Sequence, residues 1–399
     1  MVTDRDQAMR DSEPVTEQAP VLPPPPPYPA GAPEPSRPGG MFRQPAPPPQ
    51  GWAAPTRPVP LHPRPTQPAA SPPPWPAPPQ HPAPTSYAER IRPDQLVPTR
   101  KVIPGHGWRL ALYKATFGLV NLGPSAEERQ LAELEAIVRG PLRGRFKIGV
   151  MGKGGVGKTT VSACVGSLLA ELRQDDRVVA IDADTAFGKL GSRVDPKAQG
   201  SFWELAGDRH LETFADVRNR LGHNAAGLFV LAGESTPARR RVLDPAIYRE
   251  AATRLDKHFT IVVADCSSTM DSPVTQEVLR DLDALVVVSS PWVDGAAAAG
   301  QTLDWLAARG MTTLLQRTVV VLNDSDGHAD KRTKSVLAQQ FSGQGQHVIE
   351  VPFDGSLRPG GVIDGTAQMS RGARRKLVEL CAALTGFHTG YDERSRDWR

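Results

Sequence analysis

Apolar and polar positions along the chain change their pattern at about residue 145. From there on, short apolar runs rich in β-branched residues alternate with longer segments of helical periodicity. Most of these runs are continuously apolar, which is typical of strands that are buried on both faces. The alternation predicts an α/β domain over residues 145–387, with a doubly wound, mostly parallel sheet. The predicted strands cover residues 146–151, 178–182, 228–231, 260–265, 284–289, 318–322 and 347–351.

The segment before this domain, residues 101–144, has helical periodicity and is expected to be a linker or adaptor. Residues 108–122 carry apolar side chains at helical spacing with Arg109 and Lys114 between them, which predicts one helix. Ser125 and Glu128 have the spacing of a capping box and predict a second helix through about Val138. We expect the first helix to pack on the neighbouring domain, while a position at a membrane surface stays open.

Proline separates the first hundred residues from the rest. The chain has 41 prolines, most of them in residues 1–100, and that segment contains no lysine. Apolar side chains scattered singly between prolines cannot bury enough surface to offset the loss of backbone entropy, so we expect a disordered arm. Such an arm is either a docking segment for a proline-recognising protein or a spacer, and composition does not separate the two.

Charge and cysteine content bear on the binding partners and the cellular compartment that we expect. The formal net charge is +4, which is compatible with nucleic acid or an acidic membrane surface but requires neither. Cys164, Cys266 and Cys381 have no disulfide or zinc spacing, which fits a reducing compartment. The N-terminus has no apolar signal core, and no apolar run reaches the ~18–20 residues of a membrane span. We expect a cytoplasmic protein, and a peripheral position at the inner face of the plasma membrane stays open.

The sequence GKGGVGKTT at residues 152–160 is the strongest chemical signal. It fits G-x-x-x-x-G-K-[ST] and lies between a predicted strand and a predicted helix over 159–172. Glycines let backbone N–H groups face phosphates, and the helix N-terminus adds partial positive charge. Lys158 is expected to reach the β- and γ-phosphates, and the Thr159 hydroxyl to bind Mg²⁺. Predicted nucleotide contacts are Gly152, Gly154, Gly155, Val156, Gly157, Lys158, Thr159 and Thr160.

A second lysine, Lys153, lies inside this loop, where the bound phosphates do not obviously need its charge. The motif KGGVGKTT resembles the deviant Walker A motif of the ParA/MinD family of P-loop ATPases, which belong to the SIMIBI class of P-loop NTPases. The resemblance implies ATP with Mg²⁺ as ligands and a homodimer in the ATP-bound state. It also implies that Lys153 contacts the nucleotide of the partner subunit, so Lys153 joins Lys158 as a candidate catalytic residue.

Three aspartates follow predicted strands in the order that the family has. Asp182 and Asp184 end the strand at 178–182, and Asp265 ends the strand at 260–265 in the form of a Walker B motif. Carboxylates at the C-terminal ends of strands are placed to orient water or bind a metal. The resemblance implies that Asp184 positions the attacking water, while Asp182 and Asp265 join Thr159 at the metal. A pair of turn-forming aspartates at 182 and 184 is the alternative.

Base recognition is predicted at two later strand ends. In the family, the asparagine that matches Asn323 contacts the purine base, and the segment VPFD at 351–354 resembles the loop that flanks it, with Pro352 and Asp354 as candidates. Residues 323–326 also fit N-x-x-D, which is close to the guanine-reading N-K-x-D element. The lysine of that element is missing, so ATP is favoured over GTP.

Two departures from the family's sequence motifs affect the rate of ATP hydrolysis that we expect. Thr185 stands where the family often has proline, and Cys266-Ser-Ser-Thr269 follows the Walker B aspartate without the usual proline or glycine. A switch without these residues is expected to move differently, so we expect hydrolysis to be slow and dependent on a partner.

The wider layout is similar to EspI-type proteins, which are associated with type VII (ESX) secretion systems of actinobacteria. The similarity rests on residues 107–109, 121–123 and 295–306 and on the proline-rich arm. It implies a switch that regulates or helps assemble such a system, with a secretion-system or other protein partner on the arm. One alternative is a partitioning ATPase that binds DNA through residues 239–241 and 371–376, which is not favoured; another is a scaffold. Residues 388–399 are expected to form a polar tail.

Overall fold

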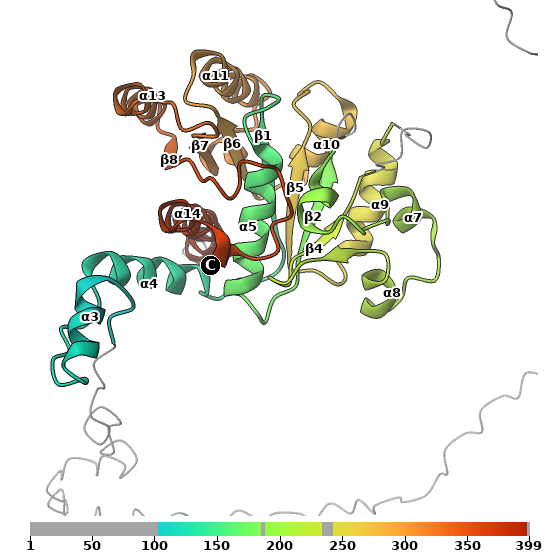
Figure 1. The fold of residues 1–399 in the computed structure, drawn as a ribbon. Helices are drawn as coiled ribbons and strands as arrows, with labels where there is room; N and C mark the ends of the chain where they lie inside the picture. Colours follow the sequence, from blue (N-terminus) through green and yellow to red (C-terminus); the bar gives the residue numbers. More distant parts are fainter. Residues whose placement is uncertain (1–102, 185–187, 234–241, 397–399) are drawn as a thin grey trace, which may run out of the picture. The chain divides into compact units, whose positions relative to one another are not determined.

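The computed structural model describes residues 103–184, 188–233 and 242–396, with side chains described up to His388 (Figure 1). The predicted disordered arm, Thr185 and the basic residues 239–241 lie outside the described residues. No described helix is long and apolar enough to cross a membrane.

An eight-stranded sheet in the order β3-β4-β2-β5-β1-β6-β7-β8 forms the centre of the fold. All neighbours pair in parallel except β3 and β4, which are antiparallel. The predicted doubly wound, mostly parallel α/β fold is therefore confirmed. The strands are β1 (Phe146–Gly152), β2 (Val178–Ala183), β3 (Gly222–His223), β4 (Phe229–Leu231), β5 (Ile261–Cys266), β6 (Ala284–Ser289), β7 (Thr318–Asn323) and β8 (His347–Val351).

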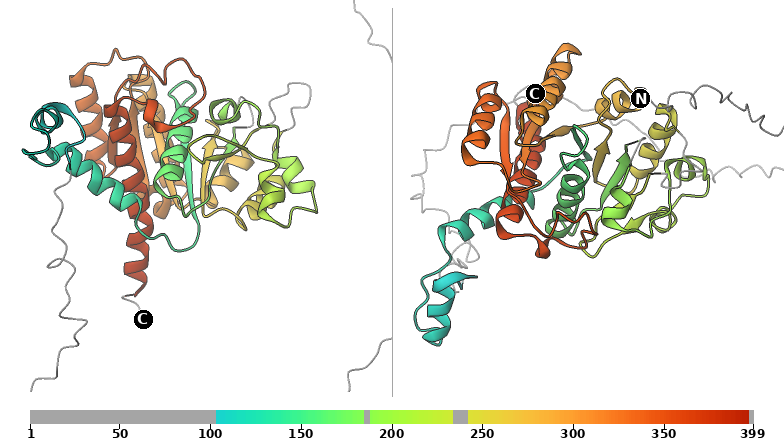
Figure 2. Two further views of the ribbon diagram at one scale, coloured as in Figure 1. Left: turned by 60° about the horizontal axis from the view of Figure 1, so that its bottom comes forward. Right: turned by 45° about the horizontal axis from the view of Figure 1, so that its top comes forward.

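Helices cover both faces of this sheet (Figures 1 and 2). They are α3 (Gly107–Ala115), α4 (Ala126–Val138), α5 (Lys158–Leu172), α6 (Leu190–Val194), α7 (Phe202–Gly207), α8 (Phe214–Arg218), α9 (Pro245–Leu255), α10 (Pro273–Arg280), α11 (Val293–Ala308), α12 (Thr312–Gln316), α13 (Lys331–Gly343), the 3-10 helix η2 (Thr366–Gln368) and α14 (Arg371–Arg396).

Two hydrophobic cores lie on opposite faces of the sheet, because successive strand residues point to opposite sides. On one face, Ile148 and Val150 of β1 pack with buried residues of α5 and α14. On the other face, Met151 of β1 packs with buried residues of α9, α10 and α11. The central strands β1, β2, β5 and β6 are buried along their whole length, which explains their continuously apolar sequences.

Parallel pairing brings the C-terminal ends of β1, β2, β5, β7 and β8 to one edge of the sheet. Asp182 lies opposite Asp265 in the β2–β5 register, Gly152 lies opposite Val288 and Asn323 lies opposite Val351. The predicted chemistry-bearing residues therefore gather where open α/β sheets bind their ligands.

The helical segment before the domain differs from expectation in one respect. The capping box is confirmed, with Ser125 Oγ accepting from Glu128 N at 3.2 Å and Glu128 Oε2 accepting from Ser125 N at 2.6 Å. The first helix, however, ends at Ala115 and not at 122, because Phe117 and Gly118 have φ values of 49° and 87°.

The position of α3 also differs from the preferred interpretation. No residue of α3 is buried, so this helix does not pack into the domain. It is α4 that packs on the domain, where Glu135 lies 3.1 Å from Arg374 of α14. At the other end of the chain, α14 continues to Arg396, through most of the segment that was expected to be a polar tail.

The burial of the three cysteines predicts that their thiols react slowly in the native chain. Cys164, Cys266 and Cys381 are buried, and desolvation raises the pKa of Cys164 and Cys266 to about 12 and that of Cys381 as well. A raised thiol pKa leaves almost no thiolate at pH 8, and only the thiolate reacts. We expect no fast reaction of the native chain with Ellman's reagent at pH 8, and three reactive thiols in urea. Rapid modification of the native chain would contradict this burial.

Candidate nucleotide-binding site

The loop between β1 and α5 has the backbone of a phosphate cradle. Gly152, Gly155 and Gly157 have φ values of 149°, 87° and 97°, a region that side chains other than glycine rarely adopt. Gly157 is also the N-cap of α5, so the loop leads directly into a helix N-terminus. A Cβ on Gly152 would lie 2.2 Å from the Val288 carbonyl oxygen, whereas one on Gly154 would meet nothing within 4 Å. Packing against β6 thus fixes the start of the loop, and its middle faces open space.

Lys158 places a buried positive charge at this cradle. Its residue is 9 % exposed, and its Nζ donates to the Lys153 carbonyl oxygen at 3.3 Å. It forms no ion pair with any residue that the structure describes. A buried ammonium without a paired anion is costly. The site therefore fits an anionic ligand such as a triphosphate.

Asp182 and Asp265 lie beside the cradle on adjacent strands. Both are buried, at 3 % and 1 % exposure. Desolvation and the neighbouring Asp265 raise the pKa of Asp182 to about 8. Desolvation raises the pKa of Asp265 to about 6, against the opposing effects of Thr159, Lys158 and Ser162. A bound cation would stabilise the charged form of two adjacent buried carboxyl groups of this kind.

The donor set suits magnesium better than a metal held by protein alone. Asp265 interacts with the side chain of Thr159, so a hydroxyl and a carboxylate meet at the first turn of α5. Asp182 Oδ2 accepts from Leu190 N at 2.9 Å, and Asp182 Oδ1 accepts from Asp184 N at 3.3 Å. No described group of three or more His, Cys, Asp or Glu residues could hold a metal ion. Mg²⁺ commonly uses one or two carboxylates and completes its shell with phosphates and water, which these residues fit.

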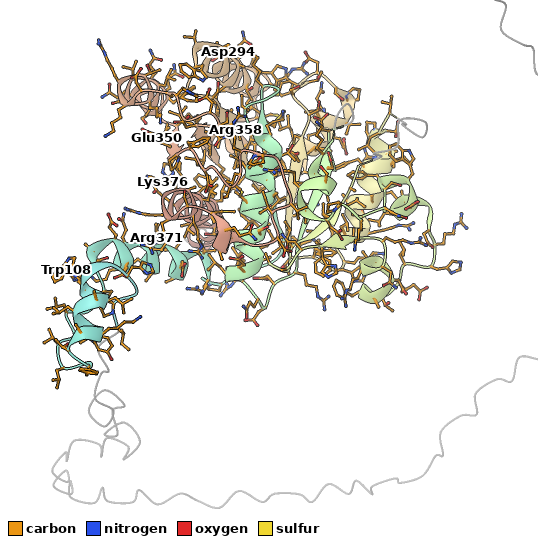
Figure 3. All side chains as sticks on the ribbon, in the orientation of Figure 1. Trp108, Asp294, Glu350, Arg358, Arg371 and Lys376 are labelled. Carbon is orange, nitrogen blue, oxygen red and sulfur yellow. The ribbon has the colours of Figure 1, made fainter. Side chains whose placement is uncertain are left out.

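A cavity of about 440 Å³ opens next to the cradle. The structure brings together predicted residues from three distant segments on its wall, and Arg358, which Figure 3 labels, lines it as well. The predicted residues on this wall are Gly155, Gly157, Thr159, Thr160, Asn323, Pro352 and Asp354. Val156 is buried in the core, and Gly152 and Lys158 are buried at the base of the loop.

The candidate base-recognition residues organise the wall of this cavity. Asn323 Nδ2 donates to the Val156 carbonyl oxygen at 2.8 Å, which ties β7 to the P-loop. The Asp354 carboxylate accepts from Ser356 N at 2.8 Å and from Ser370 N at 2.7 Å, so it shapes the loop after β8. The cavity is large enough for a planar ring, which is consistent with the predicted purine site.

Arg193 of α6 is a residue at this site that the sequence did not indicate. It is 5 % exposed, and its Nη2 donates to Thr160 Oγ1 at 2.8 Å and to the Leu357 carbonyl oxygen at 3.3 Å. Its Nη1 donates to the Gly361 carbonyl oxygen. One guanidinium thus joins the P-loop to the loop after β8, as a positioning residue. A single arginine in a short helix carries no sequence motif, so only the fold reveals it.

Lys153 points away from the cradle in this structure. Its Nζ lies 2.5 Å from Asp294 Oδ2 in the first turn of α11, and the two side chains are 46 % and 66 % exposed. Figure 3 labels Asp294 on α11. An exposed ion pair contributes only about 0–1 kcal/mol, so this contact is easily broken.

Sequence comparison identifies the family to which the chain with this site belongs. The profile of the CobQ/CobB/MinD/ParA nucleotide binding domain matches residues 148–358, from β1 through the loop after β8. The chain belongs to this family. The family resemblance that the motifs indicate is thereby confirmed.

The curated relatives include a secretion-associated protein. The ESX-1 secretion-associated protein EspI of Mycobacterium tuberculosis is 34% identical over 289 residues, which are 71% of this chain and 43% of that protein. The chain thus spans less than half the length of this relative. An uncharacterised ATP-binding protein of Methanocaldococcus jannaschii is 28% identical over 141 residues, 35% of this chain and 51% of that protein.

Solved structures with a similar fold include two archaeal MinD proteins. The cell division ATPase MinD of Pyrococcus furiosus is 21% identical with a TM-score of 0.46, over 59% of this chain and 98% of that one. The septum site-determining protein MinD of Pyrococcus horikoshii, complexed with Mg-ADP, is 21% identical with a TM-score of 0.47, over 62% and 99%.

The surroundings of Gly152 and Gly154 predict a large effect of substitution by alanine at the first position and almost none at the second. Gly152→Ala adds a methyl group against the Val288 carbonyl at a φ of 149°, and we expect a loss of about 2–4 kcal/mol in unfolding free energy. Gly154→Ala is the matched control, because its Cβ meets nothing, and we expect a change within about 0.5 kcal/mol. Urea denaturation measures both, and equal effects would contradict the loop geometry.

Proposed function

We propose that this chain is an ATP-binding and hydrolysing switch. The observation that carries the proposal is the juxtaposition of the buried Lys158 ammonium with the buried carboxylates of Asp182 and Asp265 at one sheet edge. Lys158 and the backbone N–H groups of residues 152–160 would bind the phosphates, while Thr159, Asp182 and Asp265 would hold Mg²⁺. The bound metal would neutralise phosphate charge during phosphoryl transfer.

Asp184 is the proposed water-positioning residue. It follows directly on β2, is partly exposed, and its backbone N–H bonds to the buried Asp182 carboxylate at 3.3 Å. This contact fixes the backbone of Asp184 beside Asp182, one of the proposed metal-binding residues. Hydrolysis transfers the γ-phosphoryl group to that water, and the proposed rate is slow because Cys266–Thr269 lacks the usual switch residues.

Release of Lys153 from Asp294 is the proposed link between nucleotide and dimer. In the ATP-bound homodimer, Lys153 would leave its exposed ion pair and reach the partner subunit's nucleotide. Charge supplied across an interface in this way stabilises the phosphoryl-transfer transition state. Hydrolysis would remove the γ-phosphate, whose negative charge attracts Lys153 across the dimer interface.

ATP is the proposed nucleotide, and a guanine-specific site is disfavoured. Guanine-reading loops need a free carboxylate at the last position of their motif. Here Asp326 Oδ2 accepts from Trp292 Nε1 at 3.3 Å and Asp326 Oδ1 accepts from His328 N at 3.1 Å, and Asp326 does not line the cavity.

The proposed setting is regulation or assembly of a type VII (ESX) secretion system. The identity to EspI supports this, although that protein is more than twice as long as the shared region. The proposed partner contact is the proline-rich arm, and the proposed location is the cytoplasm, with peripheral contact at the inner face of the plasma membrane.

DNA binding is a weaker candidate because the described basic cluster of α14 is largely neutralised. Arg374 pairs with Glu135, Arg375 lies 3.9 Å from Glu127, and Lys376 pairs with Glu379. Phosphate-binding clusters require cations that are free to release counterions.

Substitution of the two loop lysines should affect Mg·ATP binding and dimerisation separately. We expect Lys158→Ala to weaken Mg·ATP binding at least ~100-fold, because charge-assisted contacts to phosphate are lost in a buried site. We expect Lys153→Ala to keep binding within about threefold but to lose ATP-dependent dimerisation. Calorimetry and light scattering measure the two properties.

Lys197→Ala is the matched control, since Lys197 is exposed and does not line the cavity. The switch proposal fails if the unaltered chain stays monomeric with ATP and with ADP alike, or if Lys153→Ala dimerises normally.

Removal of residues 1–100 should show whether partner binding depends on the arm while Mg·ATP binding depends on the ATPase domain. We expect Mg·ATP binding to be retained, because every described residue of the site follows residue 150, and capture of secretion-system proteins to be lost. Pull-down with ATP and with ADP measures capture. Unchanged capture by the shortened chain would place the partner contact elsewhere.

A further inference from the structure

The helix α3 and the loop after it expose an unusual share of the apolar side chains. Six of the thirteen large apolar side chains that are exposed in the described part of the chain fall between residues 103 and 122. We call these six residues the α3 surface: Ile103, Trp108, Phe117, Leu119, Val120 and Leu122. Clusters of exposed apolar residues on a folded protein mark contact surfaces.

Polar contacts, and not burial, hold α3 in place. No α3 residue is buried, yet Arg109 Nη1 donates to the Pro124 carbonyl oxygen at 3.2 Å and Gly105 N donates to Glu128 Oε1 at 2.9 Å. Both contacts join α3 to the N-terminal end of α4, which packs on the domain. Figures 1 and 2 show α3 beyond α4, on the side away from the sheet, and Figure 3 labels Trp108 on it.

The loop after α3 presents its apolar side chains from a strained backbone. Phe117 has a φ of 49°, which is an outlier for a bulky residue, and its side chain is 96 % exposed. Leu119 is 89 % exposed. The loop is fixed by Gly118 N donating to the Tyr113 carbonyl oxygen at 2.8 Å and Val120 N donating to Thr116 Oγ1 at 3.2 Å. The backbone of this loop is strained and held by hydrogen bonds, yet its apolar side chains remain exposed to solvent. This combination indicates that the loop contacts another molecule.

Along the sequence, the charged residues of this surface are cations, whereas in space Glu127 and Glu128 of α4 line a pocket together with Trp108. No Asp or Glu occurs between Asp94 and Glu127, while Arg100, Lys101, Arg109 and Lys114 lie in that interval. Lys114 is exposed in the last turn of α3. Exposed aromatic and aliphatic side chains on α3 and in the loop after it, with the exposed Lys114 in the same segment, match the interface of an anionic bilayer. There, apolar side chains enter the acyl boundary and cations meet headgroups.

We propose that the α3 surface binds an anionic lipid bilayer, with Trp108, Phe117 and Leu119 entering the interfacial region and Lys114 meeting anionic headgroups. The surface protrudes from the domain as a helix and a loop tip, which suits a bilayer plane better than a protein groove. This proposal does not depend on nucleotide binding, since the nucleotide cavity contains no residue before 155.

Vesicle sedimentation of the full chain tests the proposal. We expect binding to vesicles that contain phosphatidylglycerol to exceed binding to pure phosphatidylcholine vesicles by about tenfold or more at low salt. Raising NaCl from about 0.05 M to about 0.5 M should remove most of that difference by screening. A chain with Trp108→Ala, Phe117→Ser and Leu119→Ser should lose binding at least ~tenfold, because apolar insertion is removed.

Val336→Ser is the matched control, as it removes an exposed apolar side chain on α13, and we expect it to bind vesicles like the unaltered chain. The triple variant should keep its melting temperature and Mg·ATP affinity, because it changes no buried residue. Absence of vesicle binding by the unaltered chain, or undiminished binding by the triple variant, overturns the proposal. So does a self-association that the triple variant abolishes in the absence of any vesicle binding, which would make the surface a protein interface.

Discussion

The site depends on a set of buried charges that the protein alone leaves unbalanced. Lys158 at the start of α5 and Asp182 and Asp265 near the C-terminal ends of the adjacent strands β2 and β5 are all nearly excluded from water. Desolvation raises the pKa of Asp182 to about 8 and that of Asp265 to about 6, so burial disfavours the charged form of both carboxyl groups. A triphosphate would bring negative charge to Lys158, and its divalent cation would bring positive charge to the two carboxylates. The burial that disfavours these charges in the protein alone would therefore strengthen their contacts with the ligand.

The sequence predicts the sheet and the cradle because both leave local signals. Every predicted strand appears within about two residues of its expected bounds, since strands buried on both faces must be continuously apolar. The two-residue strand β3 leaves no such pattern. The end of α3 was not predictable from periodicity, because apolar spacing continues through Leu122 while the backbone turns at Phe117. Arg193 was missed because its contacts join segments more than 160 residues apart, which only tertiary structure defines.

The difference between Lys153 and Lys158 is one of burial. Both belong to the same glycine-rich loop, but Lys158 is 9 % exposed and Lys153 keeps a side chain that is 46 % exposed. Removing the charge of a buried group costs its full electrostatic contribution, whereas an exposed pair exchanges partners at little cost. The proposed movement of Lys153 to a partner subunit would need the second kind of environment. The exposed pair with Asp294, in the first turn of α11, would meet this need.

One helix connects the nucleotide loop to the α3–α4 segment. The N-terminus of α5 forms the cradle, and next to its C-terminus Arg173 donates to the carbonyl oxygens of Val138 and Gly140, at the end of α4. Near that end Glu171 also accepts from Thr366 N at 2.8 Å, just before α14. These contacts are largely buried, so α4 cannot shift without α5. The orientation of the α3 surface is thus coupled to the same helix that begins at the phosphate cradle, because Arg109 and Gly105 bond to Pro124 and Glu128 at the start of α4.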